Sequence, residues 1–307
     1  MDEGGAVIDI LVKALALIAI IGIGLGIKRL GWARTEDVGL FAKLVLRVTL
    51  PCALASAFND FTITASLLVL SALGLVVNLI QQTTGYLMGR TAEERAFGVL
   101  NVNSYNMGAF ATPYLAGFMG PQTIVYSAMF DVGNALGAAG VGYAWSSSLA
   151  RGARLTPWQF LRLMFSSVIF DVYLFLVIMR LFDLHLPAPI LTFTSLVGSA
   201  NTFLAMLMIG IGLELRLPNH KYAAAARYLG VRYGWAIVFA LVTWFLLPLD
   251  HPSKVVLTMV YFAPIASMIP GFTQENGGDV ELSSFMNGIS IVVAMIAMPL
   301  LAGVIKG

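Results

Sequence analysis

The sequence predicts an all-α integral membrane protein in which ten transmembrane helices form two inverted five-helix repeats. Three observations lead to this fold class. Of the 307 residues, 59% are hydrophobic and 11% are charged, and the mean hydropathy is +0.86, far from the composition of a soluble domain. Long apolar runs recur along the whole chain, and the basic residues gather in every second connection between them.

Ten apolar runs are long enough to cross a bilayer, whose hydrocarbon core of ~30 Å needs about 20 residues per helix. We expect transmembrane helices over residues 6–27, 38–58, 62–88, 96–119, 122–147, 160–182, 187–214, 231–249, 254–273 and 282–304. The first run follows the acidic MDEGG and lacks the basic start of a signal peptide, so we expect it to be a retained helix.

The basic residues predict how the helices are oriented. Connections after the odd-numbered runs hold twelve of them: Lys28, Arg29, Arg34, Arg90, Arg95, Arg151, Arg154, Arg162, Arg216, Lys221, Arg227 and Arg232. Connections after the even-numbered runs and the two tails hold only Arg180, Lys254 and Lys306. Because basic loops stay in the cytoplasm, we expect a multi-pass protein of the cell membrane, inner or plasma, with both termini extracytoplasmic.

The chain divides naturally into residues 1–150 and 151–307, at the linker SSSLARGARLTP. Five helices per half give the second half the opposite topology, as in many transporters. The fourth helix of each half carries a proline seven residues before a glycine, Pro113 and Gly120 in one and Pro270 and Gly277 in the other. Helix breakers near mid-membrane are tolerated only beside protein or a water-filled cavity, so we expect two broken helices there.

Several stretches of the chain resemble the auxin efflux carrier family of membrane transporters. They are IKRLGWARTEDVGLFAKLVLRVTLP, YNMGAFATP, YFAPIASM, and NGGDVELSS leading into IAMPL, and the resemblance covers nearly the whole chain. Its most specific pieces are Asn106, Gly108 and Pro113 in the fourth run, and Gly277 to Asp279 before the last run.

The resemblance implies a fold similar to sodium/proton antiporters and bile acid:sodium symporters, with helices 4 and 9 broken and crossing at the substrate site. It also implies an elevator-like transport domain that moves against a scaffold, and a homodimer formed through the scaffold helices. Bacterial members of the family are linked to dicarboxylates such as malate and malonate, and plant members export auxin, also a carboxylate. Departures from the family pattern leave the substrate and the coupling ion open; they occur at Lys13, Ile291, Ala294 and Ala297.

Polar and helix-breaking residues of the fourth run are the first candidates for substrate binding. We expect Pro113 to break the helix, Gly108 to allow close approach, and Asn106 to meet the anion together with the freed backbone N–H groups. Asn103 lies three residues before Asn106, so the two should share a helix face. Hydrogen bonding between helices is the alternative role for these asparagines, and we expect that role for Asn101.

Three residues outside the fourth run complete the predicted substrate site. Pro264 and Asn287 lie in the ninth and tenth runs, near the expected crossing. Arg47 lies about ten residues into the second run, and its planar guanidinium suits a carboxylate. The alternative for Arg47 is a structural ion pair with a buried aspartate of the fifth or sixth run, Asp131 or Asp171.

Those two aspartates are the candidates for binding a coupling ion. Asp131, in the small-residue stretch MFDVGNALGAAG, could carry a proton, pair with a cation or the broken-helix amides, or bind sodium. Asp171 lies among apolar residues of an expected scaffold helix, where a structural role competes with ion coupling.

These residues predict a secondary active transporter of a small organic anion, a carboxylate such as a dicarboxylate or an auxin-like acid. A proton- or sodium-coupled symporter resembling the bile acid carriers, and a channel or receptor on the same fold, are the alternatives. An enzyme is not expected, because no histidine lies in an apolar run and no serine has an evident base. We expect no cofactor, no metal site and no nucleic acid partner.

Overall fold

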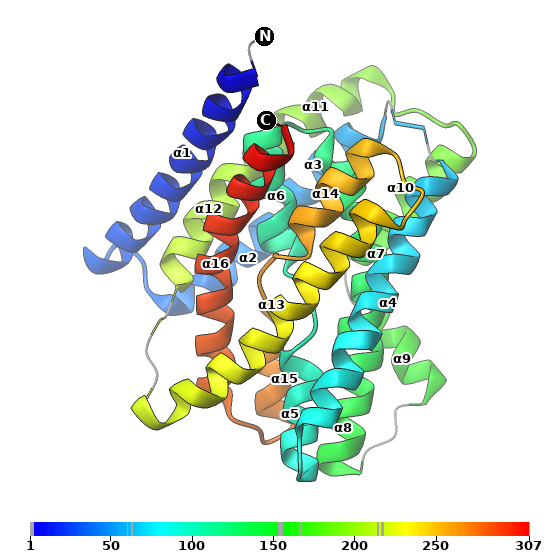
Figure 1. The fold of residues 1–307 in the computed structure, drawn as a ribbon. Coiled ribbons are helices and arrows are strands. Elements are labelled where there is room, and N and C mark those ends of the chain that lie inside the picture. The colour runs from blue at the N-terminus through cyan, green and yellow to red at the C-terminus, as the bar shows by residue number, and fades with distance from the viewer. Residues whose placement is uncertain are drawn as a thin grey trace.

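The computed structural model describes residues 3–59, 61–62, 64–152, 156–165, 168–213, 215 and 218–306. Within these ranges the chain is helical and contains no strand, which confirms the all-α fold class (Figure 1). The start of α1 and the end of α16 lie at the same end of the helical bundle (Figure 1).

The helices of the first half, in chain order, are α1 (Glu3–Arg29), η1 (Thr35–Asp37), α2 (Val38–Leu44), the π-helical η2 (Val45–Thr49), α3 (Leu50–Asn59), α4 (Ala65–Met88), α5 (Ala92–Asn101), the π-helical η3 (Met107–Ala111), α6 (Thr112–Met119), α7 (Thr123–Ala135), the π-helical η4 (Leu136–Gly142) and α8 (Tyr143–Arg151). Those of the second half are α9 (Pro157–Met164), α10 (Val168–Leu181), α11 (Ala188–Ser199), α12 (Asn201–Gly212), η5 (Asn219–Lys221), α13 (Tyr222–Phe245), α14 (His251–Val260), α15 (Ile269–Glu275) and α16 (Val280–Lys306).

Seven helical stretches of the described chain are long and apolar enough to cross a membrane. They are Val7–Arg29, Thr35–Asn59, Leu67–Met88, Thr123–Arg151, Ala188–Gly212, Asn219–Phe245 and Val280–Ile305. Each matches one of the ten runs expected from the sequence. The chain is therefore a helical multi-pass membrane protein.

Two of the remaining runs, 96–119 and 254–273, do not form single continuous helices. The third, 160–182, corresponds to α9 and α10, and residues 166–167 between them lie outside the described residues. The predicted start of the eighth run at residue 231 is also wrong, because α13 begins at Tyr222. The first turns of α13 contain polar and basic residues that are typical of a connecting loop, and the error placed Arg232 outside the helix.

Two of the interrupted helices unwind completely for several residues. Residues 102–106 separate α5 from η3, and residues 261–268 separate α14 from α15. Ser104 adopts a φ of 70°, in the left-handed region, which no α-helix can accommodate. Pro113 instead lies six residues into the continuous helical stretch that η3 and α6 form together, beyond the unwound residues 102–106, so the expectation that Pro113 breaks the helix is wrong.

Close packing of the long helices depends on glycines at a few positions. A Cβ at Gly133 of α7 would overlap the backbone of Ser71 in α4, and a Cβ at Gly24 of α1 would overlap the backbone of Leu207 in α12. The glycine- and alanine-rich stretch around Asp131 therefore brings helices together, as the sequence predicts.

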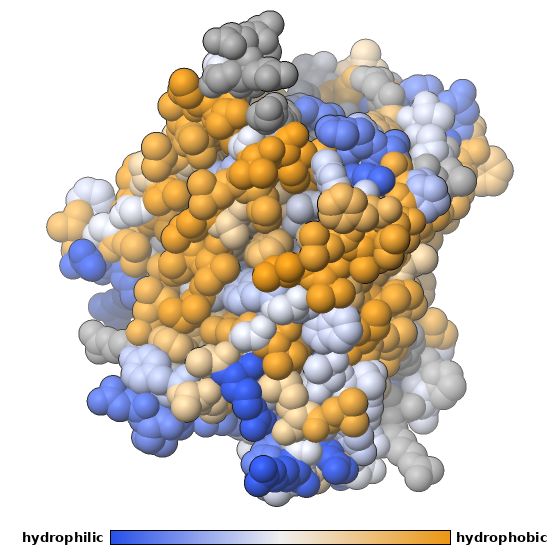
Figure 2. All heavy atoms as spheres, viewed as in Figure 1, coloured by the Kyte–Doolittle hydropathy of each residue, from blue (hydrophilic) through white to orange (hydrophobic). Residues whose placement is uncertain are grey.

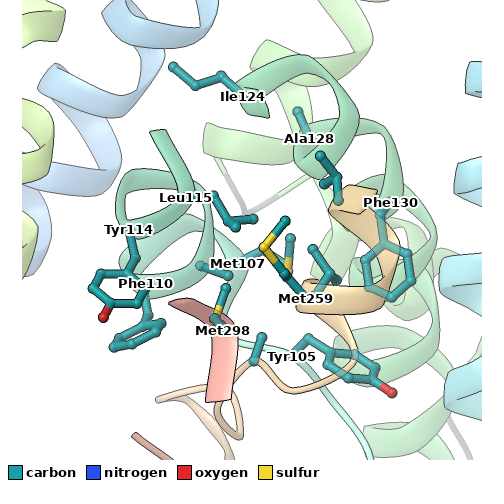
Figure 3. Packing of buried hydrophobic residues seen from close by; sticks show 14 of the residues in the cluster. Tyr105, Met107, Phe110, Tyr114, Leu115, Ile124, Ala128, Phe130, Met259 and Met298 are labelled. Atoms are coloured by element: carbon teal, nitrogen blue, oxygen red, sulfur yellow. The ribbon is translucent and has the colours of Figure 1, made fainter. Parts of the chain in front are cut away.

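The buried interior is apolar, with aromatic and methionine side chains from several helices in one cluster. Side chains of η3, α6, α7, α14 and α16 converge there, among them Met107, Leu115, Phe130, Met259 and Met298 (Figure 3). On the face shown in Figure 2, hydrophobic residues cover most of the middle and hydrophilic residues gather toward the two ends. This banding is what a bilayer requires of its protein surface.

Candidate functional site

The two unwound segments are joined directly to each other, and we call the pair the crossing. The backbone N–H of Asn106 donates to the carbonyl of Pro264 at 2.8 Å, and Asn106 Nδ2 donates to Ser267 Oγ at 2.7 Å. The backbone N–H of Ala266 donates to Ser104 Oγ at 3.2 Å. Backbone groups freed by one broken helix are thus paired with the other, as the low-dielectric interior demands.

Arg232 of α13 lies fully buried against the crossing. Its guanidinium donates to four carbonyls, those of Val102 (3.1 Å), Asn103 (2.8 Å), Ser104 (2.7 Å) and Ala263 (2.8 Å). Its Cζ lies 4.9 Å from the centroid of the Tyr105 ring. Among the described residues, no carboxylate forms an ion pair with Arg232. One side chain therefore satisfies carbonyls of both unwound segments and brings a positive charge to them.

The sequence interpretation missed Arg232 because it assigned this arginine to a cytoplasmic connection. In the structure Arg232 lies ten residues into α13, between the alanines of YAAAAR and the apolar WAIVFALV. The helix-forming run of alanines before it was the available signal, since it extends the apolar stretch back to residue 222.

The last helix holds the second unwound segment in place. Asn287 Nδ2 donates to the carbonyl of Ile265 at 2.7 Å, and the backbone N–H of Ile265 donates to Ser290 Oγ at 2.9 Å. Asn287, predicted to bind substrate, is half-buried and adjoins the crossing through this bond. Ser267 and Met268 are exposed beside it, and their backbone N–H groups have no acceptor among the described residues.

Two asparagines hold the first unwound segment from its other side. The backbone N–H of Ser104 donates to Asn78 Oδ1 and that of Tyr105 to Asn134 Oδ1, each at 3.0 Å. Asn134 Nδ2 in turn donates to the carbonyl of Tyr105 at 2.9 Å. These bonds from α4 and α7 replace the helical hydrogen bonds that residues 102–106 lack.

Asp131 is buried one turn before Asn134 and is connected to the crossing through it. Its Oδ1 accepts from Asn134 Nδ2 at 2.7 Å, and its Oδ2 accepts from the Tyr173 hydroxyl of α10 at 2.9 Å. No ion pair joins Asp131 to Arg47 in the described chain, so the expected alternative of a structural pair between these two residues is wrong.

Arg47 and Asp171 are both exposed, on η2 and α10 respectively. Neither forms a hydrogen bond or an ion pair with any described residue, so the second expected pair, Arg47 with Asp171, is also not formed. Beside Arg47, the side chains of Leu46 and Leu50 approach Gly108, where an added Cβ would meet them at 3.2 and 3.1 Å. Gly108 therefore gives η2 and α3 close access to the crossing, as expected.

The remaining asparagines of the fourth run differ in their surroundings. Asn103 does not share a helix face with Asn106, because both lie in the unwound segment. The Asn103 side chain is enclosed, and neither its Oδ1 nor its Nδ2 has a hydrogen-bond partner among the described residues. Asn101 has the packing role expected of it, since it bonds to Thr273 and Ser283.

Open cavities occur on both sides of the crossing. One of about 500 Å³ lies between α3, the α6–α7 turn and the α11–α12 region; its polar lining comes from Ser56, Gln122, Ser195, Ser199 and Thr202. Another, of about 630 Å³, lies around the start of α5 and the α15–α16 turn, and none of its lining residues belongs to the unwound segments.

No group of three or more His, Cys, Asp or Glu side chains in the described ranges is arranged to hold a metal ion. The chemistry that the crossing offers is hydrogen bonding to an anion, by amide, hydroxyl and backbone N–H donors in a region of positive charge. Comparison of the chain with protein-family models and with curated proteins finds no match in either set.

Proposed function

We propose that this protein is a secondary active carrier of a small organic anion, a carboxylate such as a dicarboxylate or an auxin-like acid. The observation that carries the proposal is the buried Arg232, which donates to carbonyls of two unwound segments and forms no ion pair with a carboxylate of the described residues. Unwound backbone at membrane depth is the usual place where transporters bind substrates and ions.

The proposed substrate position is beside Asn106 and Ser267, on the exposed side of the crossing. Ser267 and Met268 offer unpaired backbone N–H groups there, and the Asn106 amide and the Ser267 hydroxyl add side-chain donors. Pro264 and Asn287 fix the shape of this region. The proposed anchor for the carboxylate is the exposed Arg47 of η2, whose neighbours Leu46 and Leu50 contact Gly108.

We further propose ten transmembrane segments in two inverted repeats, 1–150 and 151–307. Three pairs of shorter helices, α5 with α6, α9 with α10 and α14 with α15, would complete the seven continuous spans. The unwound segment in the fourth run of each half supports the repeat, as does the resemblance to the auxin efflux carriers. A carbonyl of each unwound segment also accepts a hydrogen bond from Arg232.

Alternating access in this proposal is an elevator movement of the crossing and its supporting helices against a scaffold that includes α1, α3 and α12. The cavity of about 500 Å³ between α3, α11 and the α6–α7 turn lies along that boundary. A cell-membrane location with extracytoplasmic termini, and a homodimer through the scaffold, belong to the same proposal.

A thermal-shift screen of mono- and dicarboxylates on the purified protein, across pH and sodium concentration, tests this function. An anion that binds the folded state raises the unfolding midpoint, because binding stabilises that state by RT ln(1 + [L]/Kd). Saturable uptake with counterflow in proteoliposomes then separates a carrier from a channel. Failure of every carboxylate to stabilise the protein under any condition would refute the anion proposal.

A further inference from the structure

Two buried charges of opposite sign lie on opposite sides of the first unwound segment. Arg232 approaches residues 102–106 from α13, and Asp131 approaches them from α7. Both side chains are buried, and neither has a partner of opposite charge in contact with it among the described residues. A buried charge without compensation is costly, so the hydrogen bonds between the two determine whether one charge compensates the other.

The connection passes through two peptide groups. Arg232 donates to the carbonyls of Asn103 and Ser104 at 2.8 and 2.7 Å. The N–H groups of the same two peptides belong to Ser104 and Tyr105, and they donate at 3.0 Å to asparagine Oδ1 atoms on the opposite side. Since the C=O and N–H of a trans peptide point in opposite directions, both dipoles are aligned between the cation and the anion.

Asn134 completes the connection. It accepts from the N–H of Tyr105 and donates to Asp131 Oδ1 at 2.7 Å. Arg232 and Asp131 therefore form an ion pair bridged by peptide groups, and the unwound segment itself is the bridge. The pair is neutral as a whole while Asp131 is ionised.

Among the described residues, no charged side chain other than Arg232 is connected to Asp131 by these hydrogen bonds, and none forms an ion pair with it. Tyr173 is the titratable side chain bonded to Asp131. Tyr105 and Tyr261 pack against Phe130 of the same helix, and their hydroxyls bond to Gln81 and Thr243. The remaining titratable side chains on α7 and the elements packed against it are Cys52, Tyr86, Tyr114, Tyr126, Asp171, Arg180, His251 and Lys254. None of these bonds to Asp131 in the described chain.

We infer that Arg232 is the fixed positive charge that selects an anion at the crossing, and that a proton on Asp131 makes this charge available. With Asp131 ionised, the bridged pair is neutral and an arriving anion meets no net charge. With Asp131 protonated, Arg232 is uncompensated, and an anion beside Asn106 and Ser267 offsets it. The inference rests on the proposed function, and it makes proton and anion bind together.

The proton has a defined place in this scheme. It binds Asp131 Oδ2, whose O–H then donates to the Tyr173 hydroxyl oxygen, in place of the bond that Tyr173 donates now. Oδ1 continues to accept from Asn134, so the carboxyl group keeps both of its hydrogen-bonded partners in either charge state, while the Tyr173 hydroxyl changes from donor to acceptor. Arg232 acts on the anion through the unwound segments and does not touch it, which makes it a positioning residue.

Binding of two carboxylate probes, malonate and phenylacetate, by the purified protein across pH tests the inference. Wild-type affinity should fall about tenfold per pH unit over the range where Asp131 loses its proton, because one proton is linked to binding. Asparagine at position 131 carries no charge at any pH, so the affinity of Asp131→Asn for the probes should vary by no more than about twofold across the pH range. Glu93→Gln, an exposed carboxylate on α5, is the matched control and should keep the wild-type pH dependence. Asp131→Asn that keeps this pH dependence would overturn the inference.

A double-mutant cycle tests the bridged pair without any ligand. Thermal midpoints of wild type, Asp131→Asn, Arg232→Gln and the double variant should be non-additive, with the double variant more stable than the sum predicts. The control cycle pairs Arg232→Gln with Tyr173→Phe, which removes a hydrogen bond but no charge, and it should be additive. Equal behaviour of both cycles would refute the charge coupling.

Two results separate the inference from the proposed function. If neither probe binds the wild type, the proposed function is refuted for these carboxylates. The double-mutant cycle then still tests the charge coupling between Asp131 and Arg232. If Arg232→Gln does not fold, proton uptake decides: malonate added in weak buffer should draw about one proton per bound anion into wild type and none into Asp131→Asn. Equal uptake by both proteins would overturn the inference.

Discussion

The backbone N–H of Asn106 donates to the carbonyl of Pro264, and this 2.8 Å bond joins two segments that are 158 residues apart in the chain. The bond involves only backbone atoms of Asn106, so the side chain of Asn106 is free to serve another purpose. Its Nδ2 donates to the exposed Ser267.

Asn106→Ala should therefore weaken carboxylate binding more than it weakens the fold. Loss of one hydrogen-bonding group at the anion predicts an affinity about tenfold lower, while the bond to Pro264 keeps the crossing intact. Titration of the bound carboxylate by calorimetry measures the first effect and the thermal midpoint the second. Asn101→Ala is the converse control, since its buried bonds to Thr273 and Ser283 serve packing. Equal affinities of Asn106→Ala and wild type would contradict this role.

Arg232→Gln should lower the free energy of unfolding by about 3 kcal/mol or more. A glutamine amide can donate to at most two of the four carbonyls, and each buried carbonyl left without a donor costs about 1–3 kcal/mol. Thermal unfolding in detergent measures the loss. Arg47→Gln is the control for stability, because Arg47 is exposed and unpaired and should change the unfolding free energy by less than about 0.5 kcal/mol.

Arg47→Gln should nevertheless reduce carboxylate affinity at least about tenfold, if its guanidinium anchors the anion by a charge-assisted hydrogen bond. The protein should still reach the membrane and unfold at the wild-type temperature. Binding measured on purified variants separates the two effects, and Arg47→Lys should recover part of the affinity by keeping the charge. An unchanged affinity in Arg47→Gln would remove Arg47 from the substrate site.

Gly133→Ala should destabilise the protein by about 1–3 kcal/mol, because its Cβ would overlap the backbone of Ser71 and force α4 and α7 apart. Gly234→Ala is the matched control in α13, where an added Cβ meets nothing within 4 Å. That substitution should be neutral or stabilise by up to about 1 kcal/mol, since alanine is the better helix former. Equal midpoints for the two variants would show that the α4–α7 contact tolerates separation.

The turn before α16 gives stability a dependence on acid pH. Partial burial acts to raise the pKa of Asp279, but the backbone N–H of Leu282 and the Lys221 ammonium outweigh it and hold the pKa below its ordinary value. Because the pKa of Asp279 is lower in the folded state than in the unfolded state, its ionised form stabilises the fold. This stability is fully present above the unfolded-state pKa near 3.8 and is lost as pH falls through the folded-state pKa. Thermal midpoints between pH 7 and pH 3 should therefore fall less steeply in Asp279→Asn than in wild type. Parallel curves would contradict the assignment.

Apolar length and helix breakers made much of this fold predictable. Seven of the ten expected runs coincide with helices that can cross a membrane, and both fourth helices are interrupted. Proline, however, indicated the wrong place for the break in the first half. Residues 102–106 unwind because Arg232, Asn78 and Asn134 bond to their backbone, and these side chains come from three other helices.

Two polar residues singled out from the sequence lie at the crossing, Asn106 at its own helix break and Asn287 in the unbroken α16. Asn106 and Asn287 both adjoin the crossing, whereas Arg232 escaped notice because basic residues near a run's end are ordinarily assigned to a loop. The two expected ion pairs of Arg47 do not form, because they were inferred from depth in the membrane alone. Depth along a helix is readable from sequence, but the direction of a side chain depends on the helix phase.

The rotation of side chains around the helix axis changes at η2, the π-helical stretch between α2 and α3. A π-turn holds one residue more than the α-helical ladder needs, and each residue turns an α-helix by about 100°. Deleting a single residue between Val45 and Thr49 would leave a helix that spans the same membrane with nearly the same length. It would also rotate the part of this helix before the deletion by about 100° relative to the part after it. The side chains of Arg47 and Leu50 could then not both point in their present directions. A relative lacking one residue here would look unchanged in hydropathy, yet would present a different surface to Gly108.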